Sequence, residues 1–231
     1  MTMRVLVTGA SRGIGRAIAL RLAAPGVTLL LAGRDRTALE KTGADADARG
    51  AKSLLLPFDL SDPAQAEALI AEVSGSPLDV LINNAGVSRV KPLQDQTLAD
   101  WQETLAVNVT APFLLCRGLI KNIPRGGTII NVISSAGRTG FPNWSSYCMS
   151  KFALEGFTKS IREELRPRGI KVMSLFPSAT ATEIWDRVQG EWPRDKMMKP
   201  EHVADAVAAA LEQPAEVSVE EIVVGPISGR L

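Results

Sequence analysis

The chain has 231 residues, of which 45% are hydrophobic and 22% charged, and its formal net charge is +1 at pH 7. This balance is typical of a soluble globular domain and, without any basic or acidic block, argues against nucleic acid or a membrane surface as partner. With two cysteines, no signal peptide and no apolar run of the ~20 residues that a membrane span needs, we expect one cytoplasmic domain over residues 1–231.

Apolar runs and helical segments alternate along the whole chain. The apolar runs predict strands at 3–8, 27–33, 52–58, 78–84, 127–134, 170–176 and 219–224. Between them, helical spacing of apolar residues predicts helices near 14–22, 35–49, 63–73, 97–122, 145–166 and 201–212. Strands that are apolar throughout and separated by helices predict an α/β fold. We expect a Rossmann-type doubly wound parallel sheet of about seven strands in a single three-layer domain.

Ligands of such sheets bind at the carboxyl ends of the strands, so the turns after each strand are the informative segments. The first turn reads TGASRGIG and leads directly into a helix. Glycine lets backbone N–H groups approach a pyrophosphate, and the helix N-terminus supplies positive potential. The spacing differs from the usual GxGxxG, and a purely structural turn is the alternative. The turn predicts a dinucleotide site formed by Gly9, Ser11, Arg12, Gly13, Ile14 and Gly15.

The turn after the second strand bears on the choice of cofactor. An acidic residue there would bind the ribose hydroxyls of NAD and repel a 2′-phosphate, but this chain has Gly33 followed by Arg34. Arg34 and Arg12 together favour NADP(H) over NAD(H). Asp35, one residue further on, could instead face the ribose, which would favour NAD(H). The alternative for Arg12 and Arg34 is that both are solvated and bind no phosphate. The residues expected to line the adenine and ribose pocket after the next two strands are Asp59, Leu60, Asn83, Ala85 and Gly86.

The segment from Ser134 to Lys151 holds the only tyrosine, Tyr147, and a lysine four residues later. On a helix these two residues share one face. A cation beside the phenol would lower its pKa from about 10 and make it a usable acid or base. A surface Tyr–Lys pair is the alternative. The single histidine, His202, and the two cysteines do not have the spacing of a metal site, so we expect no metal.

With these residues the sequence resembles the short-chain dehydrogenase/reductase family, in its short single-domain branch. The motifs span nearly the whole chain: TGxxxGxG ending at Gly15, NNAG ending at Gly86, the VNV asparagine Asn108, a serine thirteen residues before the tyrosine, and YxxxK ending at Lys151. Each motif alone is weak. Five of them in order, at the spacing of the family, make a specific resemblance.

The resemblance implies hydride transfer between a carbonyl and an alcohol with a nicotinamide cofactor. Tyr147 would exchange the proton with the substrate oxygen, and Lys151 would lower the pKa of Tyr147 and bind the nicotinamide ribose. Ser134 or its neighbour Ser135 would hydrogen-bond the substrate oxygen, and the spacing to Tyr147 favours Ser134. Asn108 would hold a water in a proton relay. The residues implied at the nicotinamide are Pro177, Thr180 and Thr182, although Ser178 replaces the usual glycine of the family.

The segment 178–198 is expected to cover the substrate. The substrate pocket predicted from these positions consists of Ser134, Ala136, Phe141, Trp144, Tyr147 and Trp185. Ordinary packing is the alternative for each tryptophan, above all for Trp192.

The favoured function is an NADP(H)-dependent carbonyl reductase acting on a small-molecule ketone or aldehyde, or the reverse reaction. A 3-oxoacyl-(acyl-carrier-protein) reductase is the alternative, supported by Arg125 and Arg168 and opposed by the C-terminal sequence EEIVVGPISGRL. A catalytically silent NAD(P)-binding regulatory protein is disfavoured by the intact catalytic set. The length leaves no room for the substrate domain of an epimerase, and an enoyl reductase would show a wider Tyr–Lys spacing. The resemblance also implies a homotetramer or homodimer that packs through the helices at 97–122 and 145–166.

Overall fold

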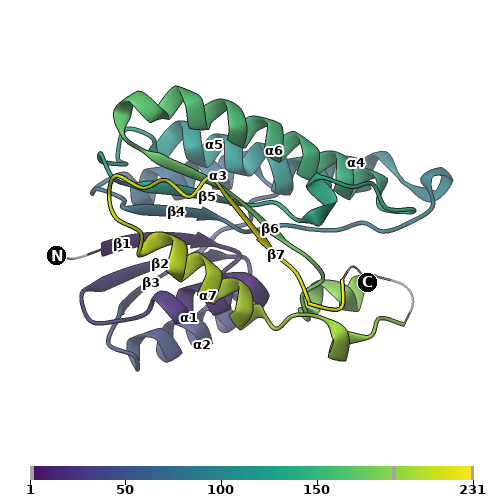
Figure 1. The fold of residues 1–231 in the computed structure, drawn as a ribbon, viewed down its shortest axis with the longest axis horizontal. Helices are drawn as coiled ribbons and strands as arrows, with labels where there is room; N and C mark the ends of the chain where they lie inside the picture. The colour runs from purple at the N-terminus through teal and green to yellow at the C-terminus, as the bar shows by residue number, and fades with distance from the viewer. Residues whose placement is uncertain (1–2, 189–190, 230–231) are drawn as a thin grey trace.

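The computed structural model describes residues 3–188 and 191–229. Seven parallel strands form one sheet in the order β3-β2-β1-β4-β5-β6-β7 (Figure 1). The strands are β1 Met3–Thr8, β2 Val27–Gly33, β3 Lys52–Pro57, β4 Val80–Asn83, β5 Thr128–Val132, β6 Lys171–Pro177 and β7 Glu221–Val224. The predicted doubly wound parallel sheet is confirmed. Its central strands are buried on both faces, as their continuous Val, Ile and Leu runs require.

Helices cover both faces of the sheet and make three layers (Figure 1). On one face lie α1 Gly13–Leu22, α2 Arg36–Asp47 and α7 Pro200–Leu211. On the other lie α3 Pro63–Val73, α4 Leu98–Leu105, α5 Ala111–Leu119 and α6 Ser145–Leu165. Each face buries its own apolar cluster against the sheet. Within the described residues, no helix is long and apolar enough to cross a membrane.

The largest difference from the sequence prediction is in the segment 97–122, which we expected to be one helix. It consists of α4, a π-helical turn at Ala106–Thr110, and α5. Thr97 caps α4 in a reciprocal pair of hydrogen bonds with Asp100. The π turn contains the buried side chain of Asn108. Such turns inside helices often accompany functional sites, and this one faces the region where the candidate site lies.

The strand order changes direction at the boundary between β1 and β4. The chain first runs outward from β1 through β2 to β3, then returns to β4 on the other side of β1. The loops after β1 and β4 therefore diverge and leave a crevice at the carboxyl end of the sheet. Thr8 joins the two loops, since its Oγ1 accepts the N–H groups of Asn84 at 2.9 Å and Ala85 at 3.0 Å.

The predicted substrate-covering segment 178–198 begins directly after β6. It contains short 3-10 helices at Glu183–Arg187 and Arg194–Lys196, and a parallel bridge joins Thr180 to Met198. Residues 189–190 of this segment lie outside the described residues.

Candidate active site

A cavity of about 660 Å³ lies along the carboxyl ends of the strands. It runs from the loop after β1 and the turn after β2, past the loops after β4 and β5, to the segment after β6. Most of the sequence-predicted site residues line it. They are Gly9, Ser11, Arg12, Gly13, Ile14, Arg34, Asp59, Leu60, Ala85, Gly86, Ser134, Ala136, Phe141, Trp144, Tyr147, Lys151, Pro177, Thr180, Thr182 and Trp185.

The glycine loop has the backbone path that its sequence predicts. Gly9 and Gly13 have φ values of +64° and +55°, which residues with a Cβ rarely adopt. Gly15 does not line the cavity; it lets α1 approach the loop, because a Cβ there would lie 2.3 Å from the Gly9 carbonyl oxygen. The first turn of α1 has no acidic residue and no side-chain cap from Arg12. Its N–H groups are therefore free to bind an anion at the cavity.

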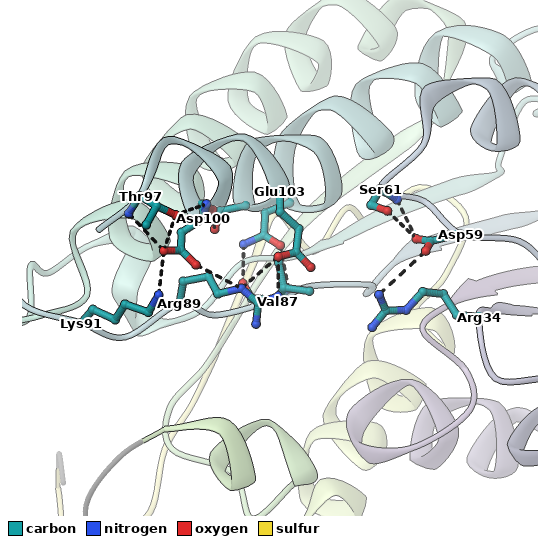
Figure 2. A network of polar contacts seen from close by, with 11 residues as sticks. Arg34, Asp59, Ser61, Val87, Arg89, Lys91, Thr97, Asp100 and Glu103 are labelled. Carbon is teal, nitrogen blue, oxygen red and sulfur yellow. Dashed lines mark hydrogen bonds and ion pairs between the residues drawn. The ribbon is translucent and has the colours of Figure 1, made fainter. Parts of the chain in front are cut away.

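Arg34, Asp35 and Asp59 lie together at the end of the cavity beside β2 and β3. The Arg34 guanidinium is 3.8 Å from Asp59 Oδ2, while Asp59 Oδ1 accepts hydrogen bonds from the backbone and hydroxyl of Ser61 (Figure 2). The carboxylate of Asp35 accepts a hydrogen bond of 3.0 Å from the Ala38 N–H and caps α2. The Asp35 carboxylate is therefore part of the N-terminal cap of α2, whereas the side chain of Arg34 is 43% exposed and lines the cavity.

The prediction that Asn83 lines the pocket is wrong. Its side chain is buried under α5, where its Nδ2 donates to Asn131 Oδ1 at 2.8 Å. Successive side chains of a strand point to opposite sides, so the next residue, Asn84, lies at the cavity. The Asn84 amide donates to the Thr8 carbonyl at 2.9 Å and fixes the glycine loop to the loop after β4.

The loop after β4 is held by a second group of charged residues. Arg89 and Lys91 form ion pairs with Glu103 and Asp100 of α4 (Figure 2). Hydrogen bonds from Lys91 and Thr97 keep the pKa of Asp100 well below its usual value. These pairs join the loop to the start of α4 and so fix one wall of the cavity.

Tyr147 and Lys151 lie in the first turns of α6, with Ser134 directly after β5. The Ser134 hydroxyl lies near enough to the Tyr147 phenol to lower its pKa. The ammonium of Lys151 lies 5.6 Å from the centre of the Tyr147 ring and donates to the Val132 carbonyl at 2.9 Å. All three side chains line the cavity.

The expected lowering of the Tyr147 pKa by Lys151 is not what the structure shows. Burial raises the pKa of Tyr147 to about 12, and the nearby Ser134 hydroxyl offsets part of this rise. Burial also lowers the pKa of Lys151 to about 8. Desolvation of both groups outweighs their mutual attraction, because the ammonium is directed to a carbonyl and not to the phenol oxygen. The phenol is therefore protonated at neutral pH.

Asn108 lies behind these residues and does not line the cavity. Its Oδ1 accepts the Val87 N–H at 2.8 Å, and its Nδ2 donates to the Val87 carbonyl at 2.9 Å and to Ser150 Oγ at 3.0 Å. Ser150 in turn donates to the Tyr147 carbonyl at 2.7 Å. The side chain thus joins the loop after β4 to the turn of α6 that carries Tyr147. The relay water implied by the resemblance stays a prediction.

The substrate end of the cavity is aromatic. Trp144 lies edge-on to Tyr147, with ring centres 5.5 Å apart, and to Trp185, at 5.7 Å. Trp185 and Trp192 are 4.7 Å apart. Trp192, for which ordinary packing was the alternative, lines the cavity as well. Lining residues that the sequence did not predict include Asn84, Pro142 and Glu183.

The described residues contain no group of three or more His, Cys, Asp and Glu side chains that could hold a metal ion. Cys116 and Cys148 are both buried, and burial raises the pKa of each thiol. The chemistry of the site therefore rests on its hydroxyls, the buried lysine and the anion-binding loop.

Comparison with known proteins agrees with this arrangement. The family model described as short chain dehydrogenase matches residues 3–192. The chain is 36% identical to sepiapterin reductase of Chlorobaculum tepidum, over 97% of this chain and 96% of the relative. It is 34% identical to 3-oxoacyl-(acyl-carrier-protein) reductase of Synechocystis, over 91% and 89% of the two chains.

A solved short chain dehydrogenase from Burkholderia cenocepacia, in complex with NADP, superposes with a TM-score of 0.86. It is 32% identical and the match covers 96% of both chains. The chain belongs to the short-chain dehydrogenase/reductase family and is an NAD(P)-dependent oxidoreductase acting on CH–OH groups.

Proposed function

We propose that the protein is an NADP(H)-dependent carbonyl reductase that converts a ketone or aldehyde to an alcohol. The observation that carries this proposal is the position of the Tyr147 phenol. It lies beside Ser134 and Lys151 in the same cavity as an uncapped helix N-terminus and the glycine loop. An anion-binding end and a proton-donating end in one cavity are what a nicotinamide reductase needs.

The residues present fit a dinucleotide. The free N–H groups of α1 and the close approach allowed by Gly9 and Gly13 suit a pyrophosphate. Arg34 and Arg12, both at the cavity, suit a 2′-phosphate, since a guanidinium binds phosphate oxygens through two parallel N–H groups. One carboxylate oxygen of Asp35 caps α2, so this acid is partly engaged in local structure. These contacts favour NADP(H) over NAD(H).

When bound, the nicotinamide supplies the hydride, and the protein supplies position and a proton. Tyr147 would donate the proton to the carbonyl oxygen, because the phenol carries its proton at neutral pH. Ser134 would hold that oxygen by a second hydrogen bond, and Lys151 would bind the nicotinamide ribose. Asn108 acts as a positioning residue through Val87 and Ser150. Pro177, Thr180 and Thr182 would contact the carboxamide.

The acyl-carrier-protein alternative receives less support from the geometry. Arg125 and Arg168 lie in the loops that precede β5 and β6, so they are at the end of the sheet away from the cavity. Each donates to a backbone carbonyl, Arg168 to Ile120 at 2.9 Å and Arg125 to Pro167 at 3.4 Å. Neither arginine lines the cavity of its own subunit.

Assembly as a homotetramer or homodimer is also proposed. The helices α4, α5 and α6 expose large apolar side chains, namely Leu98, Trp101, Phe113 and Phe152. Burial of these side chains between subunits would remove them from water.

A panel of ketones, aldehydes and acyl thioesters, with NADPH consumption as the readout, tests the proposed function. We expect turnover of free ketones or aldehydes with NADPH preferred to NADH. Turnover restricted to carrier-bound acyl thioesters would favour the alternative. Tight NADPH binding without turnover of any carbonyl would favour the silent regulatory protein.

A further inference from the structure

Three of the four tryptophans in the chain meet at one end of the cavity. We call Trp144, Trp185 and Trp192 the tryptophan cluster. The ring centres of Trp144 lie 5.5 Å from Tyr147, 5.7 Å from Trp185 and 6.4 Å from Trp192. The Trp185 indole donates to the Thr180 carbonyl at 2.8 Å, which holds its ring beside the cavity. The proton donor is therefore the innermost ring of an aromatic wall.

The ionisable side chains that line the cavity lie mainly away from this cluster. Arg12, Arg34, Asp35 and Asp59 follow β1, β2 and β3 at the opposite end, and Glu183 reaches the glycine loop, with Oε2 3.6 Å from where a Cβ on Gly13 would lie. The other described lining residues of the loops that carry the tryptophans include Phe141, Pro142 and Ile184. Apart from Lys151, no charged side chain of the described lining is in a position to pair with a charged substrate. Burial of an unpaired carboxylate or phosphate against these rings would be costly.

From these observations we infer the substrate class, resting on the proposed reductase function: the tryptophan cluster binds the ring system of a neutral, flat, aromatic ketone and places its carbonyl at Tyr147. Aromatic rings prefer offset or edge-to-face contact with other aromatic rings, beyond the gain from burial alone. A flat ring in contact with two or three indoles would gain this preference several times, whereas a puckered saturated ring of the same size would not.

The test compares 2-tetralone with 2-decalone, which have the same bicyclic size. In 2-tetralone the aromatic ring is not conjugated with the carbonyl, so the ketones differ mainly in the flatness and aromaticity of the remote ring. We expect kcat/KM with NADPH to be about tenfold or more higher for 2-tetralone. The variants Trp185→Leu and Trp192→Leu should each lower this ratio by roughly two- to tenfold. Trp101→Leu, in an exposed tryptophan on α4 outside the cavity, is the matched control and should leave the ratio unchanged.

The outcomes separate this inference from the proposed function. If both ketones are reduced equally well, the substrate class is wrong while the reductase function stands. If Trp185→Leu weakens NADPH binding and slows both ketones alike, the cluster covers the cofactor and the inference is also wrong. If no ketone is reduced, calorimetric titration of the NADPH complex with the two ketones decides the matter. Tighter binding of 2-tetralone, lost in Trp185→Leu, would still support the cluster as an aromatic site.

Discussion

Replacement of Arg34 by alanine tests the choice of cofactor. Arg34 is 43% exposed at the cavity rim, and its nearest charged partner, Asp59, is 3.8 Å away. A hydrogen bond to a charged group contributes about 1.5–3 kcal/mol, and solvent exposure reduces this to about 1–2 kcal/mol here. That loss corresponds to roughly a five- to thirtyfold higher Kd for NADPH. Removal of Arg34 also leaves the Asp59 carboxylate without its nearby cation. This carboxylate would then repel the 2′-phosphate and weaken NADPH binding further.

The assay is fluorescence titration of the protein with NADPH and with NADH. Since NADH lacks the 2′-phosphate, its Kd in Arg34→Ala should change by less than about twofold. Arg36→Ala is the matched control, because Arg36 is 73% exposed, pairs with Glu40 and does not line the cavity. An equal loss for both nucleotides, or none for NADPH, would refute the assignment of Arg34 to the 2′-phosphate.

Three other predictions follow from the site. Above about pH 8, kcat/KM for ketone reduction should fall, because burial lowers the pKa of Lys151 to about 8 and deprotonation would remove the cation proposed to bind the nicotinamide ribose. A pH–rate profile that stays level to pH 9.5 contradicts this role. Gly15→Ala should lower the free energy of unfolding by about 1–3 kcal/mol in urea titrations, since the new Cβ would meet the Gly9 carbonyl at 2.3 Å. Glu183→Gln should tighten NADPH binding about two- to fivefold in fluorescence titrations, because its carboxylate lies beside the loop that binds the pyrophosphate.

Matched substitutions serve as controls for two of these predictions. Gly75→Ala should have little effect on unfolding, since a Cβ at Gly75 has no atom within 4 Å. Asp186→Asn should leave NADPH binding unchanged, because Asp186 is exposed, pairs with Arg194 and does not line the cavity. If Gly75→Ala destabilises the protein as much as Gly15→Ala, the close approach at Gly15 is not the cause. If Asp186→Asn improves binding as much as Glu183→Gln, the effect is one of net charge.

The features that depend on short stretches of sequence were predictable. The glycine turn, the apolar strands and the spacing of Tyr147 and Lys151 are local features. The strands form the sheet, and the glycine turn, Tyr147 and Lys151 line the cavity at its carboxyl end. The pair Asn83 and Asn84 shows the limit of such reasoning. Which of two adjacent residues faces a cavity depends on where the strand ends, and a shift of one residue reverses the answer.

Other features depend on the folded environment and were not predictable. The spacing of Tyr147 and Lys151 suggested a lowered phenol pKa, but burial dominates, and its extent follows only from the complete packing. The π turn around Asn108 breaks a segment whose apolar periodicity reads as one helix. The tryptophan cluster brings together Trp144 with Trp185 and Trp192, which lie about forty residues further along the chain, after β6.

The most direct test of the account is the substitution Tyr147→Phe, which keeps the ring in contact with Trp144 and removes only the hydroxyl. We measure NADPH oxidation with a ketone that the wild-type protein reduces, and NADPH binding by fluorescence in the same preparation. The account predicts that turnover falls by about 10²–10⁴, the usual contribution of a general acid, while the Kd for NADPH changes little. Turnover close to that of the wild-type protein, with NADPH bound normally, would contradict the central claim that Tyr147 supplies the proton.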